Sequence, residues 1–470
     1  MTLLAFLIGI TLPAANGWLL LRCIEGRTPV LLRSERWALG FLTGLTGTMS
    51  LSFFLQVAAH VPFSRMGFLA LQIPLLLLLA LLARWTCGPA WLRPPTPALP
   101  PSPRPPRWAL ALLVLLGIWT VAKVGTESAL LVSLPPYFDD TVKNWNFRGK
   151  VFYVTQSVST GAPGRSENLL GQLSSYPPAV SLSKTWFASL AGEWNEGLIN
   201  SVHLAWFAAC VILFYTLLRR RMSCWWSFLG IYLLTSLPLF LIHGTQAYAE
   251  VFVAAHLLAV GSLLYSAAEA RERVHHMAFL RLAAVMLALI PLTKNEGLVL
   301  YLPPLLAIVA VTLVLLRRQD FLLHRDMQNA LLWFGLCLLV TTLPWLLYKW
   351  HLGLTFGNAH ALSGTSFAWQ PRALPAISIG LFFEGSWLLL FPLLFVLLAL
   401  EWRKAFFSPL AVLTCFFLLV FGMQIFLFLF TSLSSEATYQ TGFGRGVTQL
   451  LPFAVAVGTL LVHRLVAQNE

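Results

Sequence analysis

The chain has 470 residues, of which 58% are hydrophobic and only 10% are charged, and its formal net charge is +13. So few polar residues cannot cover the surface of a water-soluble globule of this size, which excludes a soluble enzyme. A disordered chain is excluded too, because disorder needs low hydrophobicity and dense charge. Repeated apolar stretches near the ~20 residues that cross a bilayer predict an all-α, multi-pass membrane protein.

About thirteen stretches are long and apolar enough to be membrane spans. The eighth, residues 278 to 292, fits a span least well, because it is short, Pro291 interrupts it and Arg281 lies near its start. In chain order the stretches cover residues 3 to 21, 38 to 58, 66 to 83, 108 to 123, 197 to 218, 223 to 242, 248 to 267, 278 to 292, 297 to 316, 329 to 348, 378 to 400, 407 to 431 and 447 to 463. We divide the chain into an N-terminal three-span module, a proline-rich linker, a core and a short tail, over residues 1 to 92, 93 to 107, 108 to 463 and 464 to 470. The prolines of the linker predict an extended spacer, with a proline-rich docking site as the alternative.

The basic residues predict how the spans are oriented, because short cytoplasmic loops retain positive charge during insertion. With the spans alternating, 20 of the 31 Lys and Arg residues fall on one side, which we assign to the cytoplasm. The N-terminus is then outside and the C-terminus inside. The positive charge is scattered over separate short loops without a continuous basic groove, so we do not interpret it as nucleic-acid binding.

A large loop on the outer face, residues 124 to 196, holds two of the chain's four aspartates, Asp139 and Asp140. Loops at membrane depth must be buried against protein or line a watery cavity. Four more ionisable residues fall on the same face if this topology holds: Glu250, Lys294, Glu296 and Arg445. Chemistry that needs several polar groups is therefore expected at this face.

The segment from Phe138 to Tyr153, FDDTVKNWNFRGKVFY, resembles the first outer loop of the GT-C membrane glycosyltransferases, in which an aspartate precedes a Trp-Asn-hydrophobic-basic-small-Lys run. Further elements are similar in the same order: Tyr-Pro-Pro at residues 176 to 178, QAYAE ending in Glu250, TKNEG around Lys294, and GFGRGVTQLLP before the last span. The resemblance covers residues 108 to 463. It implies a GT-C-like fold whose large outer loop carries short interfacial helices.

Members of this family take a sugar from a lipid-linked donor, usually a polyprenyl phosphate or pyrophosphate, and pass it to an acceptor on the outer face with inversion. The resemblance implies such a hexosyl or pentosyl transferase in a bacterial inner membrane, related to protein mannosyltransferases and aminoarabinose transferases, with a lipid, glycan or protein as acceptor. The alternatives are a flippase for a lipid-linked glycan and a polymerase or ligase of whole glycans. Transporters usually show internal repeats, and the sequence shows no convincing one.

Counting back five residues from Trp145 places Asp140 at the family's aspartate, with Asp139 as the second choice. An acceptor hydroxyl is a poor nucleophile at neutral pH, so a carboxylate that takes its proton would accelerate transfer by ~10²- to 10⁴-fold. Fixed cations would stabilise the departing phosphate, because its negative charge grows in the transition state. The candidate cations, in order of preference, are Arg445, Lys294, Arg148 and Lys150.

Several candidates also have a plainer structural explanation. Tyr176 and the prolines after it suit the first turn of a helix at the membrane interface, and we also consider it for substrate contact. Glu250 is predicted at the end of a span, where a carboxylate adds little to the free-energy cost of membrane insertion. Lys294 and Glu296 could pair with each other, and Arg445 could reach lipid headgroups.

The cofactor requirement stays open at this point. Some members of the family use a divalent metal ion and others do not. Asp139, Asp140 and Glu250 could supply hard oxygen ligands for Mg²⁺ or Mn²⁺.

Overall fold

The computed structural model describes residues 2–103, 105–138, 140–158, 170–355 and 367–467. Within these residues the regular elements are all helical, which confirms the predicted fold class. The α-helices are α1 (Thr2–Glu25), α2 (Arg33–Ala59), α3 (Arg65–Cys87), α4 (Arg107–Ser133), α5 (Phe147–Thr155), α6 (Ala179–Ala191), α7 (Glu196–Arg219), α8 (Cys224–Ser236), α9 (Pro238–Thr245), α10 (Glu250–Glu269), α11 (Arg273–Leu289), α12 (Leu302–Arg318), α13 (His324–His351), α14 (Ala373–Phe382), α15 (Leu390–Leu400), α16 (Trp402–Phe406), α17 (Ala411–Phe430), α18 (Ser434–Thr438), α19 (Gly442–Thr448) and α20 (Leu451–Ala467). Short 3-10 helices are η1 (Gly88–Ala90), η3 (Gly171–Ser175) and η4 (Ile290–Leu292), and π-helical segments are η2 (Thr141–Asn146) and η5 (Gly297–Tyr301).

Ten helices in the described part of the chain are long and apolar enough to cross a membrane, and two bent pairs raise the number to twelve. The bent pairs are α8 with α9, at 81°, and α19 with α20, at 49°. The least regular predicted span is present as Arg273–Leu292, because Pro291 lies in the closing 3-10 turn rather than inside the α-helix. A multi-pass membrane protein is therefore confirmed.

Two predicted boundaries were wrong. The span expected at 378 to 400 consists of two short helices, α14 and α15. A polar stretch around Glu384 interrupts it, and so does Leu388, whose backbone lies in the left-handed region at φ 53°. The outer loop expected from residue 124 begins later, since α4 continues to Ser133. Lys123 therefore lies inside α4, where its amine donates to Ser236 Oγ at 2.9 Å.

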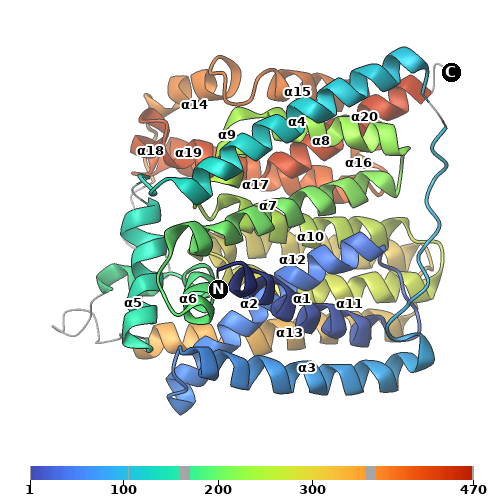
Figure 1. Ribbon diagram of the computed structural model, residues 1–470. Coiled ribbons are helices and arrows are strands. Elements are labelled where there is room, and N and C mark those ends of the chain that lie inside the picture. Colours follow the sequence, from blue (N-terminus) through green and yellow to red (C-terminus); the bar gives the residue numbers. More distant parts are fainter. Residues whose placement is uncertain (1, 104, 139, 159–169, 356–366, 468–470) are drawn as a thin grey trace.

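Figure 1 shows the long helices running side by side between two ends of a bundle. The short helices α5, α6, α14, α18 and α19 lie at one end, and the link between α3 and α4 and the last turns of α20 lie at the other. This second end belongs to the face that the sequence predicts to be basic. Its assignment to the cytoplasm stays a prediction.

Helices α1 and α2 pack with their backbones almost touching. A Cβ atom on Gly17 would lie 1.9 Å from the carbonyl oxygen of Gly40, and one on Gly44 would lie 1.8 Å from that of Pro13. Small residues permit such close packing of helices in membranes. The same two helices also contact α6, α7 and α11, so the N-terminal spans are part of the bundle.

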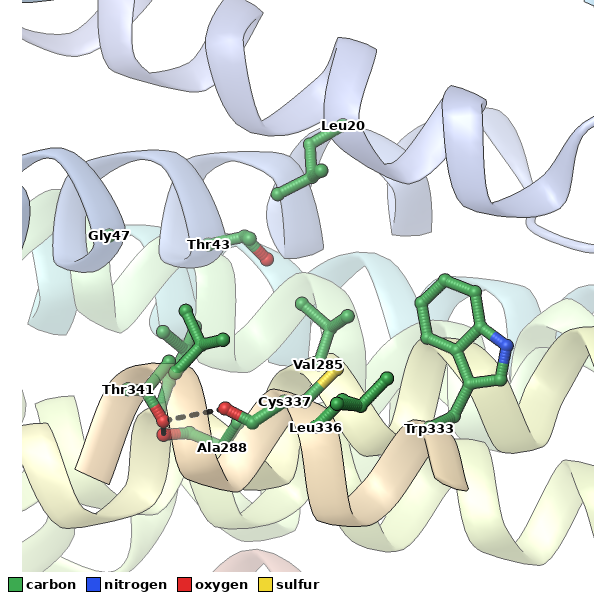
Figure 2. Close-up of a pocket in the computed structure, with 11 residues that line it drawn as sticks. Leu20, Thr43, Gly47, Val285, Ala288, Trp333, Leu336, Cys337 and Thr341 are labelled. Carbon is green, nitrogen blue, oxygen red and sulfur yellow. Dashed lines mark hydrogen bonds between the residues drawn. The ribbon is translucent and has the colours of Figure 1, made fainter. Parts of the chain in front are cut away.

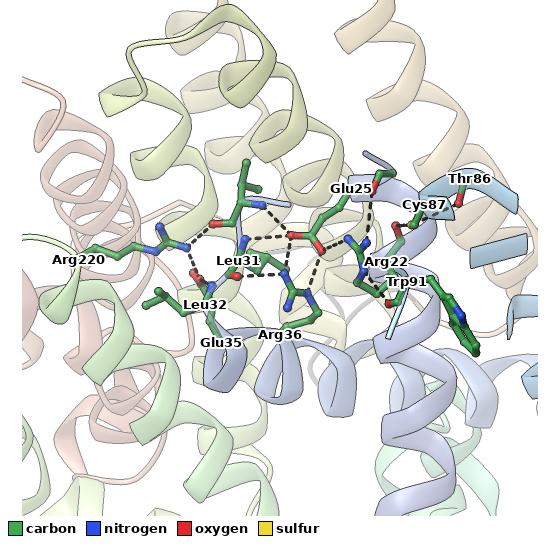
Figure 3. Close-up of polar contacts among 12 residues, drawn as sticks. Arg22, Glu25, Leu31, Leu32, Glu35, Arg36, Thr86, Cys87, Trp91 and Arg220 are labelled. Atoms are coloured by element: carbon green, nitrogen blue, oxygen red, sulfur yellow. Dashed lines mark hydrogen bonds and ion pairs between the residues drawn. The ribbon is translucent and has the colours of Figure 1, made fainter. Parts of the chain in front are cut away.

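A network of buried charges joins α1 and α2 to α7 at the basic end (Figure 3). Glu25 accepts hydrogen bonds from Arg22, at 3.0 Å, and from Arg36, at 2.9 Å and 3.1 Å. Glu35 pairs with Arg220, the residue that directly follows α7. Removing one partner of a buried pair leaves an uncompensated charge and costs ~3–5 kcal/mol. The network therefore fixes how the first two helices sit on the core.

The proline-rich linker is held against the bundle. The guanidinium of Arg219 donates to the carbonyl oxygen of Pro100, and the indole of Trp225 donates to that of Pro103, both at 2.8 Å. Figure 1 shows the linker as an extended segment without regular structure that runs along the basic end from α3 to α4. The length of the linker must therefore match the separation of these helices.

We expect this length to matter more than the prolines. Deleting residues 94 to 99 would shorten the reach of the chain by about 20 Å and displace α3 or α4. Replacing the same residues by an equal number of Gly and Ser should preserve both helices. The measurement is the yield of monodisperse protein by size-exclusion chromatography. A normal yield from the deletion would contradict this role, and a loss of yield in the Gly/Ser variant would indicate that the prolines themselves are needed.

Candidate active site

The candidate site begins where the chain leaves α4. The ring of Phe138 packs against that of Tyr248, with centroids 5.1 Å apart. Asp140 then precedes the π-helical segment η2, which continues directly into α5. The hydroxyl of Thr141 donates to the carbonyl oxygen of Ala247 at 3.2 Å. These contacts hold the Asp140 segment against the start of α10.

Arg445 bridges two carboxylates that come from distant parts of the chain. Its Nη2 atom pairs with Asp140 Oδ2. Its Nη2 and Nε atoms also lie 2.8 Å and 2.9 Å from Glu250 Oε1. The guanidinium lies 5.2 Å from the ring centre of Tyr248. Helix α19 thus joins the segment that follows α4 to the first residue of α10.

Glu250 is the centre of this cluster and is completely buried. Its Oε1 atom lies 3.3 Å from Lys294 Nζ, and its Oε2 atom lies 3.5 Å from His243 Nδ1. Lys294 also contacts Glu296 at 3.2 Å, the pairing that the sequence suggested. Burial by itself would lower the pKa of Lys294, but Glu296 and Glu250 outweigh it and raise that pKa. Lys294 therefore stays an ammonium ion.

The members of the cluster differ in accessibility. The side chains of Asp140 and Arg445 are 31% and 29% exposed, whereas that of Glu250 is 0% exposed. A substrate can therefore contact Asp140 and Arg445 directly. The buried Glu250 contacts Arg445 and Lys294 and can hold both cations in position without touching the substrate.

Arg148 and the Tyr-Pro-Pro element also come together. The buried guanidinium of Arg148 donates to the carbonyl oxygens of Tyr176, at 2.8 Å, and Pro177, at 3.3 Å, and burial lowers its pKa to about 10. The rings of Trp145 and Tyr176 are 5.7 Å apart, and burial raises the pKa of Tyr176 to about 12. Lys150 is exposed on α5 and makes no described contact with the cluster. Arg148 thus orients the element, and Lys150 lies outside the cluster.

A solved structure has a similar arrangement of helices. The chain matches the crystal structure of ArnT from Cupriavidus metallidurans, which has undecaprenyl phosphate bound, with a TM-score of 0.50 and 15% sequence identity. The match covers 76% of this chain and 61% of that chain, so the chain spans about three fifths of the ArnT length. The helices are therefore arranged as in ArnT, which confirms the expected GT-C-like fold. The sequence matches no known family profile and no curated protein.

One buried polar contact in this fold was not predicted from the sequence. Lys184 of α6 is completely buried, and its amine donates to Asn146 Oδ1 at 2.5 Å and to Asn200 Oδ1 at 2.7 Å. Asn146 belongs to the Trp-Asn run, so Lys184 ties the segment after Asp140 to α6 and α7. The signal was Asn146 itself, because a buried amide needs a hydrogen-bonding partner.

The Lys184 amine should make stability depend on pH. Burial lowers its pKa well below the usual range. The unfolded state then binds more protons between the folded pKa and the unfolded value of about 10.4, so this contribution to stability falls as the pH decreases through that interval. We expect Lys184→Met, which cannot titrate, to flatten the pH dependence of thermal unfolding. Lys150→Met at an exposed position is the control, and an unchanged pH dependence in Lys184→Met would contradict the prediction.

Two of the three metal ligands that the sequence suggested, Asp140 and Glu250, are among the described residues. Within the described part of the chain, no three His, Cys, Asp or Glu side chains are grouped so that they could hold a metal ion. Asp139, one of the three expected ligands, lies outside the described residues. The other two, Asp140 and Glu250, both contact Arg445, so a guanidinium takes the place between them.

Proposed function

We propose that the protein is a membrane glycosyltransferase that moves a hexosyl or pentosyl group from a polyprenyl-phosphate-linked donor to a lipid, glycan or protein acceptor. The reaction would take place at the outer face of a bacterial inner membrane, with the N-terminus outside and the C-terminus in the cytoplasm. The observation that carries the proposal is the Arg445 bridge between Asp140 and Glu250 in a GT-C fold. The undecaprenyl phosphate bound to ArnT supports a polyprenyl carrier for the donor.

Asp140 is the proposed general base, with Asp139 as the second choice. The acceptor oxygen would form a bond to the anomeric carbon of the sugar while the bond from that carbon to the phosphate oxygen breaks. The electron pair leaves with the phosphate, and the acceptor proton passes to the carboxylate. Attack from the side opposite the phosphate inverts the anomeric configuration.

Arg445 and Lys294 are the proposed cations for the leaving phosphate. Arg445 is partly exposed and can form two parallel hydrogen bonds to phosphate oxygens. A phosphate at this position would compete with Asp140 for the guanidinium and so free the carboxylate to take a proton. The buried Glu250 would keep Arg445 and Lys294 in place through the reaction. One arginine would then couple donor binding to activation of the base.

The proposal is tested with purified protein in liposomes and undecaprenyl phosphate that carries labelled hexoses or pentoses. Release of the sugar from the lipid, with its appearance on an acceptor, is expected. Movement of the intact labelled lipid across the bilayer without cleavage would identify a flippase instead. Product length separates one transfer from polymerisation.

A chelator arm of the same assay addresses the metal. We expect transfer to continue in EDTA, because Arg445 and Lys294 supply positive charge beside Asp140 and Glu250. Loss of transfer in EDTA that Mg²⁺ or Mn²⁺ restores would show that transfer needs a divalent metal ion, with Asp139, Asp140 and Glu250 as its candidate ligands.

A further inference from the structure

A groove opens within the bundle, away from the Asp140 cluster. It has a volume of about 360 Å³ and lies between α1, α2, α11 and α13 (Figure 2). All four helices are candidate membrane spans, so the groove opens toward lipid. The residues that shape it are Leu20, Gly47, Val285, Trp333, Leu336 and Val340. Figure 2 shows Trp333 at one end, with Gly47 and Thr341 toward the other.

The wall of the groove is predominantly apolar. Two hydroxyls lie in its wall, but each donates to the protein: Thr43 to the sulfur of Met286 at 3.1 Å, and Thr341 to the carbonyl oxygen of Ala288 at 2.7 Å. Leu336 and Val340 of α13 are 50% and 70% exposed. A hydrocarbon chain matches such a wall, because a polar ligand would lose its hydrogen bonds to water there.

The register of α11 and α13 places a cation, Arg281, near the Trp333 end of the groove. Arg281 lies one turn before Val285 on α11, so both side chains lie on the same stripe of that helix. Hydrogen bonds from Arg273 to Asp326 and from Thr341 to Ala288 both join residues 53 positions apart, so α11 and α13 run parallel and level. By this register Arg281 is level with residue 334, next to Trp333.

Arg281 has no acidic partner among the described residues. Its one described hydrogen bond goes to the carbonyl oxygen of Met277, at 3.3 Å, within its own helix. The side chain is only partly buried, and it lies within a membrane span. Ionisable residues inside a span almost always pair with another group, and an arginine suits a phosphate because it can form two parallel hydrogen bonds to it. The missing partner is therefore expected to be an anion.

We propose that this groove binds an acyl chain of an anionic phospholipid, whose phosphate pairs with Arg281. The lipid belongs to the leaflet at the basic end of the bundle, since α11 begins at that end with Arg273. Trp333 beside the phosphate fits the preference of tryptophan for the headgroup region. The site does not depend on the proposed glycosyl transfer, because none of its residues belongs to the Asp140 cluster.

Native mass spectrometry of the purified full chain with phosphatidylglycerol or phosphatidylcholine tests the proposal. We expect one phosphatidylglycerol to be retained per chain in preference to phosphatidylcholine. Arg281→Gln should weaken this retention about fivefold or more, the loss expected for one cation near a lipid phosphate. Equal retention of the two lipids, no effect of Arg281→Gln, or displacement of phosphatidylglycerol by undecaprenyl phosphate would each overturn the proposal.

A matched pair of glycine variants tests the groove separately from the charge. A Cβ atom at Gly47 or at Gly335 meets no heavy atom within 4 Å, so both positions accept a larger residue, but only Gly47 lines the groove. Gly47→Leu should fill the groove and remove the retained lipid, and Gly335→Leu should retain it as the wild type does. The same result for both variants would overturn the proposal even if Arg281→Gln did not fold.

Discussion

Replacing Asp140 by Asn is expected to slow sugar transfer by ~10²- to 10⁴-fold while the protein stays folded. The amide keeps the size of the carboxylate, and its oxygen can still accept a hydrogen bond from Arg445, but it cannot take the acceptor proton. The side chain is 31% exposed, so the change should cost little stability. The measurement is the single-turnover rate from a labelled lipid donor in liposomes.

Asp320→Asn is the matched control for this variant. It makes the same chemical change at a carboxylate whose side chain is 89% exposed and pairs only with a nearby arginine, Arg317, at 3.2 Å in the described contacts. Transfer by this control should equal that of the wild type. Near-normal turnover in Asp140→Asn would reject Asp140 as the base, and Asp139→Asn would then test the second choice.

Replacing Glu250 by Gln is expected to destabilise the protein by ~3–5 kcal/mol. The carboxylate is completely buried and contacts both Arg445 and Lys294, so its loss leaves two cations without their shared counter-charge. Arg445 would keep only its contact with Asp140 among the ion pairs described here. The measurement is the free energy of unfolding in detergent, with transfer activity followed in parallel.

Glu272→Gln provides the comparison for Glu250→Gln. Its carboxylate is 67% exposed and lies 3.7 Å from His275, and surface changes of this kind usually alter stability by less than about 0.5 kcal/mol. If Glu250→Gln unfolds no more easily than Glu272→Gln, then Glu250 does not hold the cluster together. If it is unstable but transfers sugar at the wild-type rate, then Arg445 and Lys294 do not act on the phosphate.

Local properties of the chain predicted most of the framework. Hydropathy and the scatter of arginines depend only on neighbouring residues, so they located most of the spans and separated a basic face from a face with polar loops. Hydropathy did not predict the break around Glu384, because residues 378 to 400 form a long apolar run. Mean hydropathy averages over such a run and does not detect the break. The helix is interrupted near Leu388, whose backbone lies in the left-handed region.

The candidate residues were visible one at a time in the sequence, but their partners were not. Arg445 could have met a lipid headgroup and Glu250 could have been a simple interfacial carboxylate, and nothing local decides between these alternatives and a shared site. Arg445 and Glu250 are 195 positions apart, and only the packing of α19 against α10 brings them within 2.9 Å. Likewise, the two hydrogen bonds of the Lys184 amine depend on Asn146 and Asn200, which lie on other segments.

By itself, the sequence determined a helical membrane protein and predicted most of its basic residues at one face and its candidate site residues at the other, because transfer of each segment into lipid is a property of that segment alone. Tertiary structure decided which acid meets which base, that Arg445 lies between Asp140 and Glu250, and that four helices form an apolar groove. Those outcomes depend on the relative positions of helices that are remote in the chain, and no local pattern encodes a distance between them.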